Sequence, residues 1–245
     1  MSRAQAVIQG LLVVIITAFV VPIYSINPSL AAEADCEEAD TLLATTPSPP
    51  RSVSWFKRHL HIRDELEARV DTFIVGDSLA QNWPLDLFRR AGGLRPVNAG
   101  IGSDRTQQIL WRLSAMELHR IAPRSVIVIV GTNNLSGLEK ACAISAGIMA
   151  VIRKVRAIWS DAKITFVEIP PRGEKFKDFE CQRQSVNSSV RAQVRKIANA
   201  ETFNADSIIT CGYRVECTNL NADRLHLSHS GYVSLTAALR SAGRL

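Results

Sequence analysis

The sequence predicts an α/β domain of three layers, an α/β/α sandwich in which helices cover both faces of a five-stranded parallel sheet. Three observations support this prediction. Short apolar runs alternate with helical patterns along most of the 245 residues. One run, Val126–Val130, consists of five β-branched residues, which is typical of a strand buried on both faces. Polar residues directly follow several of the runs, where parallel sheets bind their ligands.

The elements are expected in the order βαβαβαβαβα, after a first helix. The predicted strands are Thr72–Val75, Pro96–Ala99, Val126–Val130, Ile164–Ile169 and a weaker one at Thr202–Ile209. The first helix begins at Trp55, with Ile62, Leu66 and Val70 at steps of four. The later helices are predicted at Arg105–Leu118, Ala143–Ile158, Ser185–Ala198 and Gly231–Ala242. Such alternation predicts parallel strands joined by right-handed crossovers.

Residues 1–34 are predicted to be a signal peptide or an N-terminal membrane anchor. Gly10–Ile23 is a run of fourteen residues without a charge, behind a short segment that carries Arg3. This length fits the apolar region of a signal peptide better than a membrane span of about 20 residues. If the segment is retained, residues 6–24 would attach the chain to the membrane. The residues that follow are acidic, so the chain is expected to be exported, as a periplasmic or secreted protein.

Two further regions follow this segment. Residues 35–52 are acidic and then rich in Thr, Ser and Pro, which predicts a linker. Residues 53–245 form the predicted catalytic domain.

Charge and cysteine usage narrow the class of protein. The 29 basic and 23 acidic residues give a net charge of +6, but they are interleaved, so no nucleic-acid partner is expected. Five cysteines fit an exported protein. Cys211 and Cys217 are close enough to close a small loop, whereas Cys36, Cys142 and Cys181 have no obvious partner. Cysteine and histidine do not occur at metal-binding spacing, so no metal is expected.

The strand ends carry residue types that suit acyl transfer at a serine. This chemistry needs a hydroxyl, a base, a group that orients the base, and donors aimed at the oxyanion. Ser78 follows the first strand, at the expected start of a helix. Asp223 and His226 are three residues apart on a turn, where the carboxylate can fix the tautomer of the imidazole. We therefore predict Ser78 as nucleophile, His226 as base and Asp223 as its partner.

Two details refine this hypothesis. The side chain of Asn133, after the third strand, is a neutral donor that can bind an oxyanion without competing for the proton. The segment Gly76–Ala80 has Ala where a G-x-S-x-G motif needs its second Gly, so an α/β-hydrolase is disfavoured.

Four blocks in this order resemble the SGNH/GDSL hydrolase superfamily. The blocks are Gly76–Leu79, Asn98–Asp104, Gly131–Asn134 and Asp223–Ser228. The stretches NAGIGSDRTQQILWRL (Asn98–Leu113), VIVGTNNL (Val128–Leu135) and PRGE (Pro171–Glu174) resemble its branch related to platelet-activating-factor acetylhydrolase subunits. The resemblance spans roughly Trp55 to the C-terminus.

The resemblance implies the SGNH hydrolase fold, a flavodoxin-like sandwich, and a catalytic triad of Ser78, His226 and Asp223. It also implies an oxyanion hole formed by the backbone N–H of Ser78, the side chain of Asn133 and a third backbone N–H. That third donor belongs to a glycine in the family and falls at Ser103 here. The N–H group survives the change, but the added side chain can narrow the pocket or strain the backbone if φ is positive.

The sequence thus predicts an exported serine esterase that hydrolyses small, acetyl-type esters without a cofactor. The expected partner is a small acyl ester or an acylated carbohydrate. Two alternatives remain open at this point. A periplasmic polysaccharide O-acetyltransferase would use the same acyl-enzyme with a sugar hydroxyl in place of water. A non-catalytic carbohydrate-binding protein on the same fold would follow if Ser103 spoils the oxyanion hole.

Overall fold

The computed structural model describes residues 36–50, 52–66, 69–89, 95–214 and 216–245. The predicted signal peptide or anchor at 1–34, including the apolar residues 6–24, lies outside the described residues. Among the residues that are described, no helix combines the length and the apolar character that crossing a membrane requires.

The centre of the molecule is a five-stranded sheet in which every pairing is parallel. The strands are β1 (Thr72–Gly76), β2 (Pro96–Gly100), β3 (Ser125–Ile129), β4 (Lys163–Val167) and β5 (Ala200–Phe203). Their spatial order is β2-β1-β3-β4-β5, which is the flavodoxin-like order. The predicted fold class is therefore confirmed. Because the order reverses next to β1, the sheet opens a crevice at the carboxyl ends of β1 and β3.

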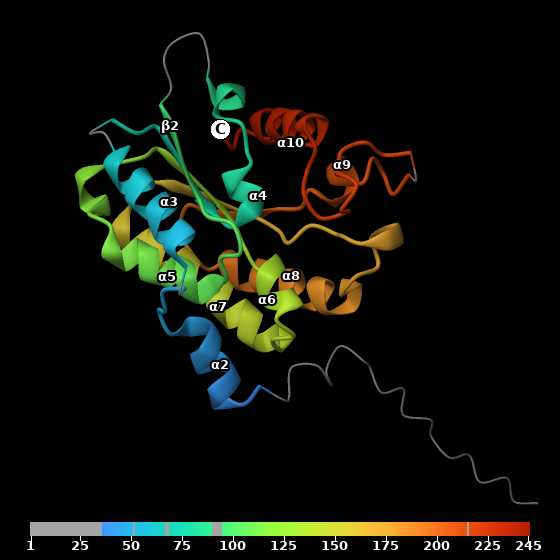
Figure 1. Cartoon of the computed structure of the whole chain (residues 1–245), viewed down its shortest axis with the longest axis horizontal. Helices are drawn as coiled ribbons and strands as arrows, with labels where there is room; N and C mark the ends of the chain where they lie inside the picture. Colours follow the sequence, from blue (N-terminus) through green and yellow to red (C-terminus); the bar gives the residue numbers. More distant parts are fainter. Residues whose placement is uncertain (1–35, 51, 67–68, 90–94, 215) are drawn as a thin grey trace, which may run out of the picture.

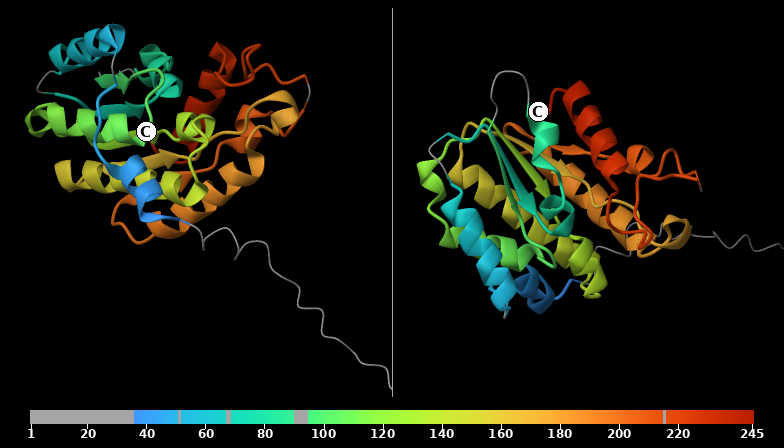
Figure 2. Two further views of the ribbon diagram at one scale, coloured as in Figure 1. Left: turned by 60° about the horizontal axis from the view of Figure 1, so that its bottom comes forward. Right: turned by 45° about the horizontal axis from the view of Figure 1, so that its top comes forward.

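Helices cover both faces of the sheet (Figures 1 and 2). The α-helices are α2 (Glu38–Thr45), α3 (Val53–Asp64), α4 (Ser78–Gln81), α5 (Thr106–Ala115), α6 (Thr132–Ser136), α7 (Ala141–Ile158), α8 (Glu180–Val194), α9 (Asp206–Ile209) and α10 (His229–Ser241). Short 3-10 helices lie at η1 (Leu85–Phe88), η2 (Leu118–Arg120) and η3 (Glu174–Phe176).

Alternate residues of β3 enter two separate cores. Val126 and Val128 pack with apolar side chains of α3, α5, α7 and α8, whereas Ile127 and Ile129 pack with those of α4, α9 and α10. This explains why the run lacks polar residues: a central strand has a helix layer over each face. Burial of both sets supplies the main driving force for folding.

Two predicted elements differ from the observed ones. The weak strand expected at Thr202–Ile209 is divided, since β5 ends at Phe203 and Asp206–Ile209 forms α9. The first helix ends at Asp64, so Leu66 and Val70 do not continue it. Val70 is nevertheless buried, because it lies just before β1 and packs in the same core as Phe73 of that strand.

The prediction that residues 35–52 form a linker was wrong for Glu38–Thr45, which form α2. This helix packs against α5 and α7, and its Ala44 is fully buried. The hydroxyl of Thr106 donates to the carbonyl of Ala44 at 2.8 Å. The acidic and Thr-rich composition did not predict this helix, because α2 is stabilised by contacts with helices that are distant in sequence.

A disulfide fastens α2 to the domain. Cys36 is bonded to Cys142 in the first turn of α7, across 106 residues of sequence. The structure also pairs Cys211 with Cys217, as their spacing allowed, and leaves Cys181 exposed without a disulfide.

Removing the first disulfide by the double substitution Cys36→Ser and Cys142→Ser is expected to lower the free energy of unfolding by about 2–4 kcal/mol, because it closes a long loop. Urea denaturation under non-reducing conditions measures the change. Cys181→Ser is the matched control and should leave the midpoint unchanged. Equal midpoints for the double variant and the control would contradict the prediction.

Candidate active site

Ser78 lies at the junction of β1 and α4, in the crevice at the carboxyl end of the sheet. Asp77 caps α4, with its Oδ1 accepting the backbone N–H of Leu79 at 2.9 Å. The buried amide of Asn98 holds the other end of the helix, donating to the carbonyls of Ala80 at 2.7 Å and Trp83 at 3.1 Å. These bonds fix the direction in which α4 presents Ser78.

Gly100, at the end of β2, permits the close approach of α4. A Cβ at this position would lie only 2.1 Å from the backbone nitrogen of Gln81. A residue with a side chain would therefore push α4, and Ser78 with it, away from the loop that follows β2.

Ser78, His226 and Asp223 are joined by two hydrogen bonds. The Nε2 atom of His226 lies 2.9 Å from the Oγ atom of Ser78. Its Nδ1 atom lies 2.7 Å from Oδ2 of Asp223. The structure thus brings Ser78 into contact with His226, which lies 148 positions later in the sequence, and His226 into contact with Asp223. A proton can pass from the hydroxyl to the imidazole while the carboxylate holds the ring.

Asp223 is held as a carboxylate by its own turn. Burial works against its ionisation, but hydrogen bonds from the His226 ring and from the backbone N–H groups of Leu225 and His226 outweigh it and lower the pKa of Asp223 to about 2. Both N–H bonds to Oδ1 measure 3.0 Å. Asp223 is therefore ionised throughout the neutral range and remains an acceptor for the ring.

Three donors predicted for an oxyanion lie around the same crevice. The backbone N–H groups of Ser78 and Ser103 have no acceptor within the described part of the chain. The amide of Asn133 donates one hydrogen to the carbonyl of Asp104 at 2.9 Å, which leaves its second hydrogen available. Gly102 places this loop beside Ser78, since a Cβ on Gly102 would lie 3.9 Å from the Cβ of Ser78.

Ser103 has a backbone conformation that is unusual for a residue with a side chain. Its φ angle is +66°, in the left-handed region that glycine adopts most readily. The backbone keeps this conformation because hydrogen bonds anchor both neighbours of Ser103, which are Gly102 and Asp104. The N–H of Gly102 donates to Oε1 of Gln81 at 2.7 Å.

A buried ion pair anchors Asp104. Arg112 donates through Nε to Oδ2 of Asp104 at 2.8 Å, and the indole of Trp55 donates to Oδ1 at 2.6 Å. The same guanidinium donates to the carbonyls of Ala99 at 2.7 Å and Gly76 at 3.2 Å. One arginine therefore ties together the ends of β1 and β2 and the loop that carries Ser103.

Asn133 is positioned by the turn that follows β3. Gly131 begins this turn with a φ angle of +120°, which residues with side chains rarely adopt. The buried Arg172 then donates to the carbonyl and the hydroxyl of Thr132, at 3.1 Å and 2.8 Å. Arg172 thus holds Thr132, the residue before Asn133, in place. Within the described part of the chain, Arg172 has no hydrogen bond to Ser78.

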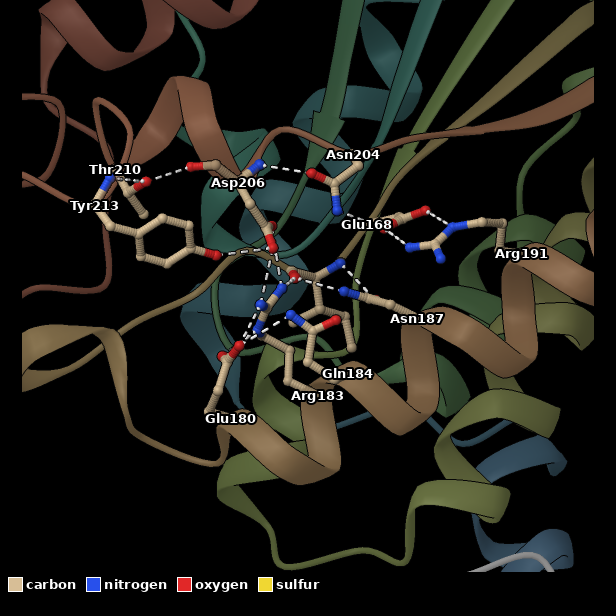
Figure 3. Close-up of polar contacts among 11 residues, drawn as sticks. Glu168, Glu180, Arg183, Gln184, Asn187, Arg191, Asn204, Asp206, Thr210 and Tyr213 are labelled. Carbon is tan, nitrogen blue, oxygen red and sulfur yellow. Dashed lines mark hydrogen bonds and ion pairs between the residues drawn. The ribbon is translucent and has the colours of Figure 1, made fainter. Parts of the chain in front are cut away.

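The segment that carries Arg172 is itself held by α8 (Figure 3). Asn187 binds both backbone groups of Ile169, accepting its N–H at 3.0 Å and donating to its carbonyl at 2.9 Å. Arg183 also donates to this carbonyl, at 2.8 Å, and forms ion pairs with Glu180 and Asp206. The side chains of α8 therefore replace a neighbouring strand just beyond the end of β4.

Asp77 differs from Asp223 in its surroundings. It is fully buried, and only one of its two oxygens has a partner. Desolvation dominates, so the pKa of Asp77 is raised to about 7, although the bond from Leu79 N–H lowers it in part. Asp77 is a cap for α4 and is not a hydrogen-bond partner of His226.

Several of these supporting residues were not predicted from the sequence. Arg112, Arg183 and Asn187 were missed, although a signal existed: each lies on the buried face of a helix beside apolar residues. Asn98 gave no comparable signal, because it lies on a strand and the carbonyls that it binds belong to another element. Among the described residues, no cluster of His, Cys, Asp and Glu has the arrangement of a metal site.

Comparison with known proteins places this site in a family. Residues 68–233 match the GDSL-like lipase/acylhydrolase family. The chain belongs to this family of hydrolases. It is 31% identical over 205 residues to the platelet-activating factor acetylhydrolase IB subunit alpha1 of Rattus norvegicus, covering 81% of this chain and 88% of that protein. It is 30% identical over 189 residues to subunit alpha2 of Homo sapiens, covering 76% and 81%.

Solved structures with low sequence identity share the fold. A GDSL-like lipase from Bacteroides thetaiotaomicron has a TM-score of 0.59 at 18% identity, covering 76% of this chain and 96% of that chain. An acetylxylan esterase from Geobacillus stearothermophilus has a TM-score of 0.58 at 16% identity, covering 71% and 94%. The predicted membership of the SGNH/GDSL superfamily is confirmed, and the protein is a carboxylic ester hydrolase.

Replacing Ser103 by Gly is expected to raise the free energy of unfolding by about 0.5–1 kcal/mol, because glycine tolerates positive φ. The backbone N–H remains, so ester hydrolysis should persist. Chemical denaturation and a hydrolysis assay measure the two effects. Ser103→Ala is the matched control, since it keeps the strained φ while removing the hydroxyl. A stability gain in Ser103→Ala equal to that in Ser103→Gly would rule out the backbone explanation.

Proposed function

We propose that this GDSL-family esterase hydrolyses small, acetyl-type esters through a Ser78 acyl-enzyme, with His226 as base and Asp223 as its partner. The observation that carries the proposal is the pair of hydrogen bonds that links the three side chains, at 2.9 Å and 2.7 Å. The distances lie within the range in which a base takes up the proton of a nucleophile.

In the first step, Oγ of Ser78 attacks the ester carbonyl carbon while its proton moves to Nε2 of His226. The carbonyl oxygen becomes an oxyanion, which the N–H groups of Ser78 and Ser103 and the amide of Asn133 stabilise. Asp223 stabilises the imidazolium that forms. The carbon–oxygen bond to the alcohol then breaks, and His226 returns its proton to the departing alkoxide.

In the second step, water replaces the alcohol. His226 takes a proton from the water as its oxygen attacks the acyl-enzyme, and the same donors hold the second oxyanion. Collapse of this intermediate breaks the bond to Oγ of Ser78, which regains its proton from His226. The acid is released, and the enzyme is restored without a cofactor.

The names of the similar proteins support acetyl-type esters as the substrates. The curated proteins at 30–31% identity are named as acetylhydrolases. A structural neighbour is named as an acetylxylan esterase, which supports an acylated carbohydrate as one form of the substrate.

We also propose that the chain is exported, and that residues 1–34 act as a signal peptide or as an anchor through residues 6–24. The two disulfides, Cys36–Cys142 and Cys211–Cys217, support this proposal. Disulfides persist mainly in oxidising compartments outside the cytoplasm.

Ser78→Ala is expected to lower kcat for 4-nitrophenyl acetate by about 10⁴-fold or more, and Asp223→Asn by about 10²–10⁴-fold, because each removes part of a coupled unit. Initial rates between pH 6 and 8 measure the loss, a range in which Asp223 is charged. Ser160→Ala, at an exposed serine between α7 and β4, is the control. A burst of nitrophenol without turnover would favour an acyltransferase that awaits a sugar acceptor. Undiminished turnover in Ser78→Ala would contradict the proposed nucleophile.

Export is tested in the host that makes the protein, by separating cytoplasm, periplasm, medium and membranes and determining the N-terminus of the recovered chain. A chain beginning near residue 35 outside the cytoplasm would establish cleavage. An intact N-terminus in the membrane fraction would establish anchoring. Recovery of the intact chain from the cytoplasm alone would refute the proposal.

A further inference from the structure

A pocket of about 430 Å³ opens beside the Gly102–Asp104 loop. Two parts of the chain that are distant in sequence form its walls. They are the start of α3 with the residues before it, and the loop after β2 with the end of α4. The lining residues are Pro50, Ser52, Ser54, Trp55, Arg58, Gln81, Ile101, Gly102, Ser103 and Asp104.

The pocket is adjacent to the catalytic serine. Gly102 lines it, and a Cβ on Gly102 would be 3.9 Å from the Cβ of Ser78. Figure 1 shows α3 on one side of α4, and α9 and α10 on the other. The pocket therefore lies on the α3 side of α4.

Arg58 is the cation that lines this pocket, and it is only partly used by the protein. Its Nη2 donates to the carbonyl of Asn98 at 2.9 Å and its Nε to that of Gly100 at 3.4 Å. A guanidinium has five N–H donors, so these bonds leave several donors available. Within the described part of the chain, Arg58 forms no ion pair.

The anionic group that lines the pocket cannot neutralise Arg58. Both oxygens of Asp104 are engaged by Trp55 and Arg112, and its side chain is completely buried. Loss of solvent around Arg58 and the charge of Arg112 lower the pKa of Arg58, an effect that the charge of Glu65 opposes in part. The half-buried guanidinium would thus gain from an anionic partner.

The other polar groups in the wall suit the same partner. Gln81 uses its Oε1 to accept from Gly102, and its Nε2 has no acceptor among the described residues. The hydroxyls of Ser52 and Ser54 lie 2.9 Å apart, so one donates to the other and the second can donate to a bound group. The groups that remain available are therefore mainly hydrogen-bond donors around one positive charge.

We propose that this pocket is a specificity subsite for a carboxylate, or an anion of similar geometry, carried by the ester substrate, with Arg58 as its principal partner. The inference rests on the proposed esterase function and deepens it by naming the substrate class. The carboxylate can belong to the acyl part or to the alcohol part of the ester. In either case a planar guanidinium offers it paired N–H donors.

The test compares esters that differ only by a carboxylate and its neutral amide. For the acyl side, the pair is monoethyl glutarate and ethyl glutaramate. For the alcohol side, it is 4-acetoxybutyrate and 4-acetoxybutanamide. The full chain is expected to prefer the carboxylate in one pair by about fivefold or more in kcat/KM, as a charge-assisted hydrogen bond would give. The pair that shows the preference identifies the side of the ester that occupies the pocket.

Arg58→Gln should bring the preference close to one, whereas Arg63→Gln should retain it. Arg63 is the matched control, because it is an exposed arginine on the same helix, paired with Asp64 outside the pocket. The two variants lose the same net charge, so a difference between them reports the pocket and not the general field of the protein.

Binding of the same four esters to Ser78→Ala, measured by calorimetry, separates the subsite from the chemistry. Tighter binding of a carboxylate than of its amide, lost in Ser78→Ala combined with Arg58→Gln, supports the subsite even if the wild-type chain turns none of them over. Absent turnover of 4-nitrophenyl acetate would count against the esterase function alone. No carboxylate preference in either pair, or a preference that survives Arg58→Gln, would overturn the subsite.

Discussion

The guanidinium of Arg112 lies almost wholly inside the protein and binds three segments that meet near Ser78, the proposed nucleophile. It donates to the carbonyl of Gly76 at the end of β1, to that of Ala99 near the end of β2, and to the carboxylate of Asp104. Burying such a pair costs desolvation energy, which is recovered only when every donor and acceptor is well placed. Here the side chains are 1% and 0% exposed, and Trp55 satisfies the remaining carboxylate oxygen. The pair therefore favours one arrangement of strand ends and loop.

Elsewhere in the site, polar side chains bind backbone groups at the ends of short helices and just beyond the end of a strand. Asn98 donates to a carbonyl at the end of α4, and Arg172 donates to the carbonyl of Thr132. Asn187 binds both the N–H and the carbonyl of Ile169. Buried backbone groups without partners are costly, so each of these bonds stabilises one course of the chain over its alternatives. The positions of the proposed catalytic residues are thus set by side chains that have no proposed part in the reaction.

The loop after β2 serves two surfaces at once. It carries Ser103, whose N–H is a proposed oxyanion donor, and it lines the pocket that contains Arg58. Arg58 also binds the outer carbonyls of β2, which is an edge strand. A substrate anion in the pocket would consequently contact a residue that already fixes the position of this loop. The proposed subsite and the proposed oxyanion donor Ser103 therefore share the same structural support.

The sequence by itself determined the sheet, the crossovers and the residues at the strand ends, because each depends on a short apolar run and on what directly follows it. The order of Ser78, Asn133, Asp223 and His226 could be recognised for the same reason. The tertiary structure alone decided the packing of α2, the division of the predicted strand at Thr202–Ile209, and the positive φ of Ser103. It also decided the partners of Arg58, Arg112 and Asn187. These features depend on which backbone groups and side chains from distant segments meet, and periodicity along one segment carries no information about such contacts.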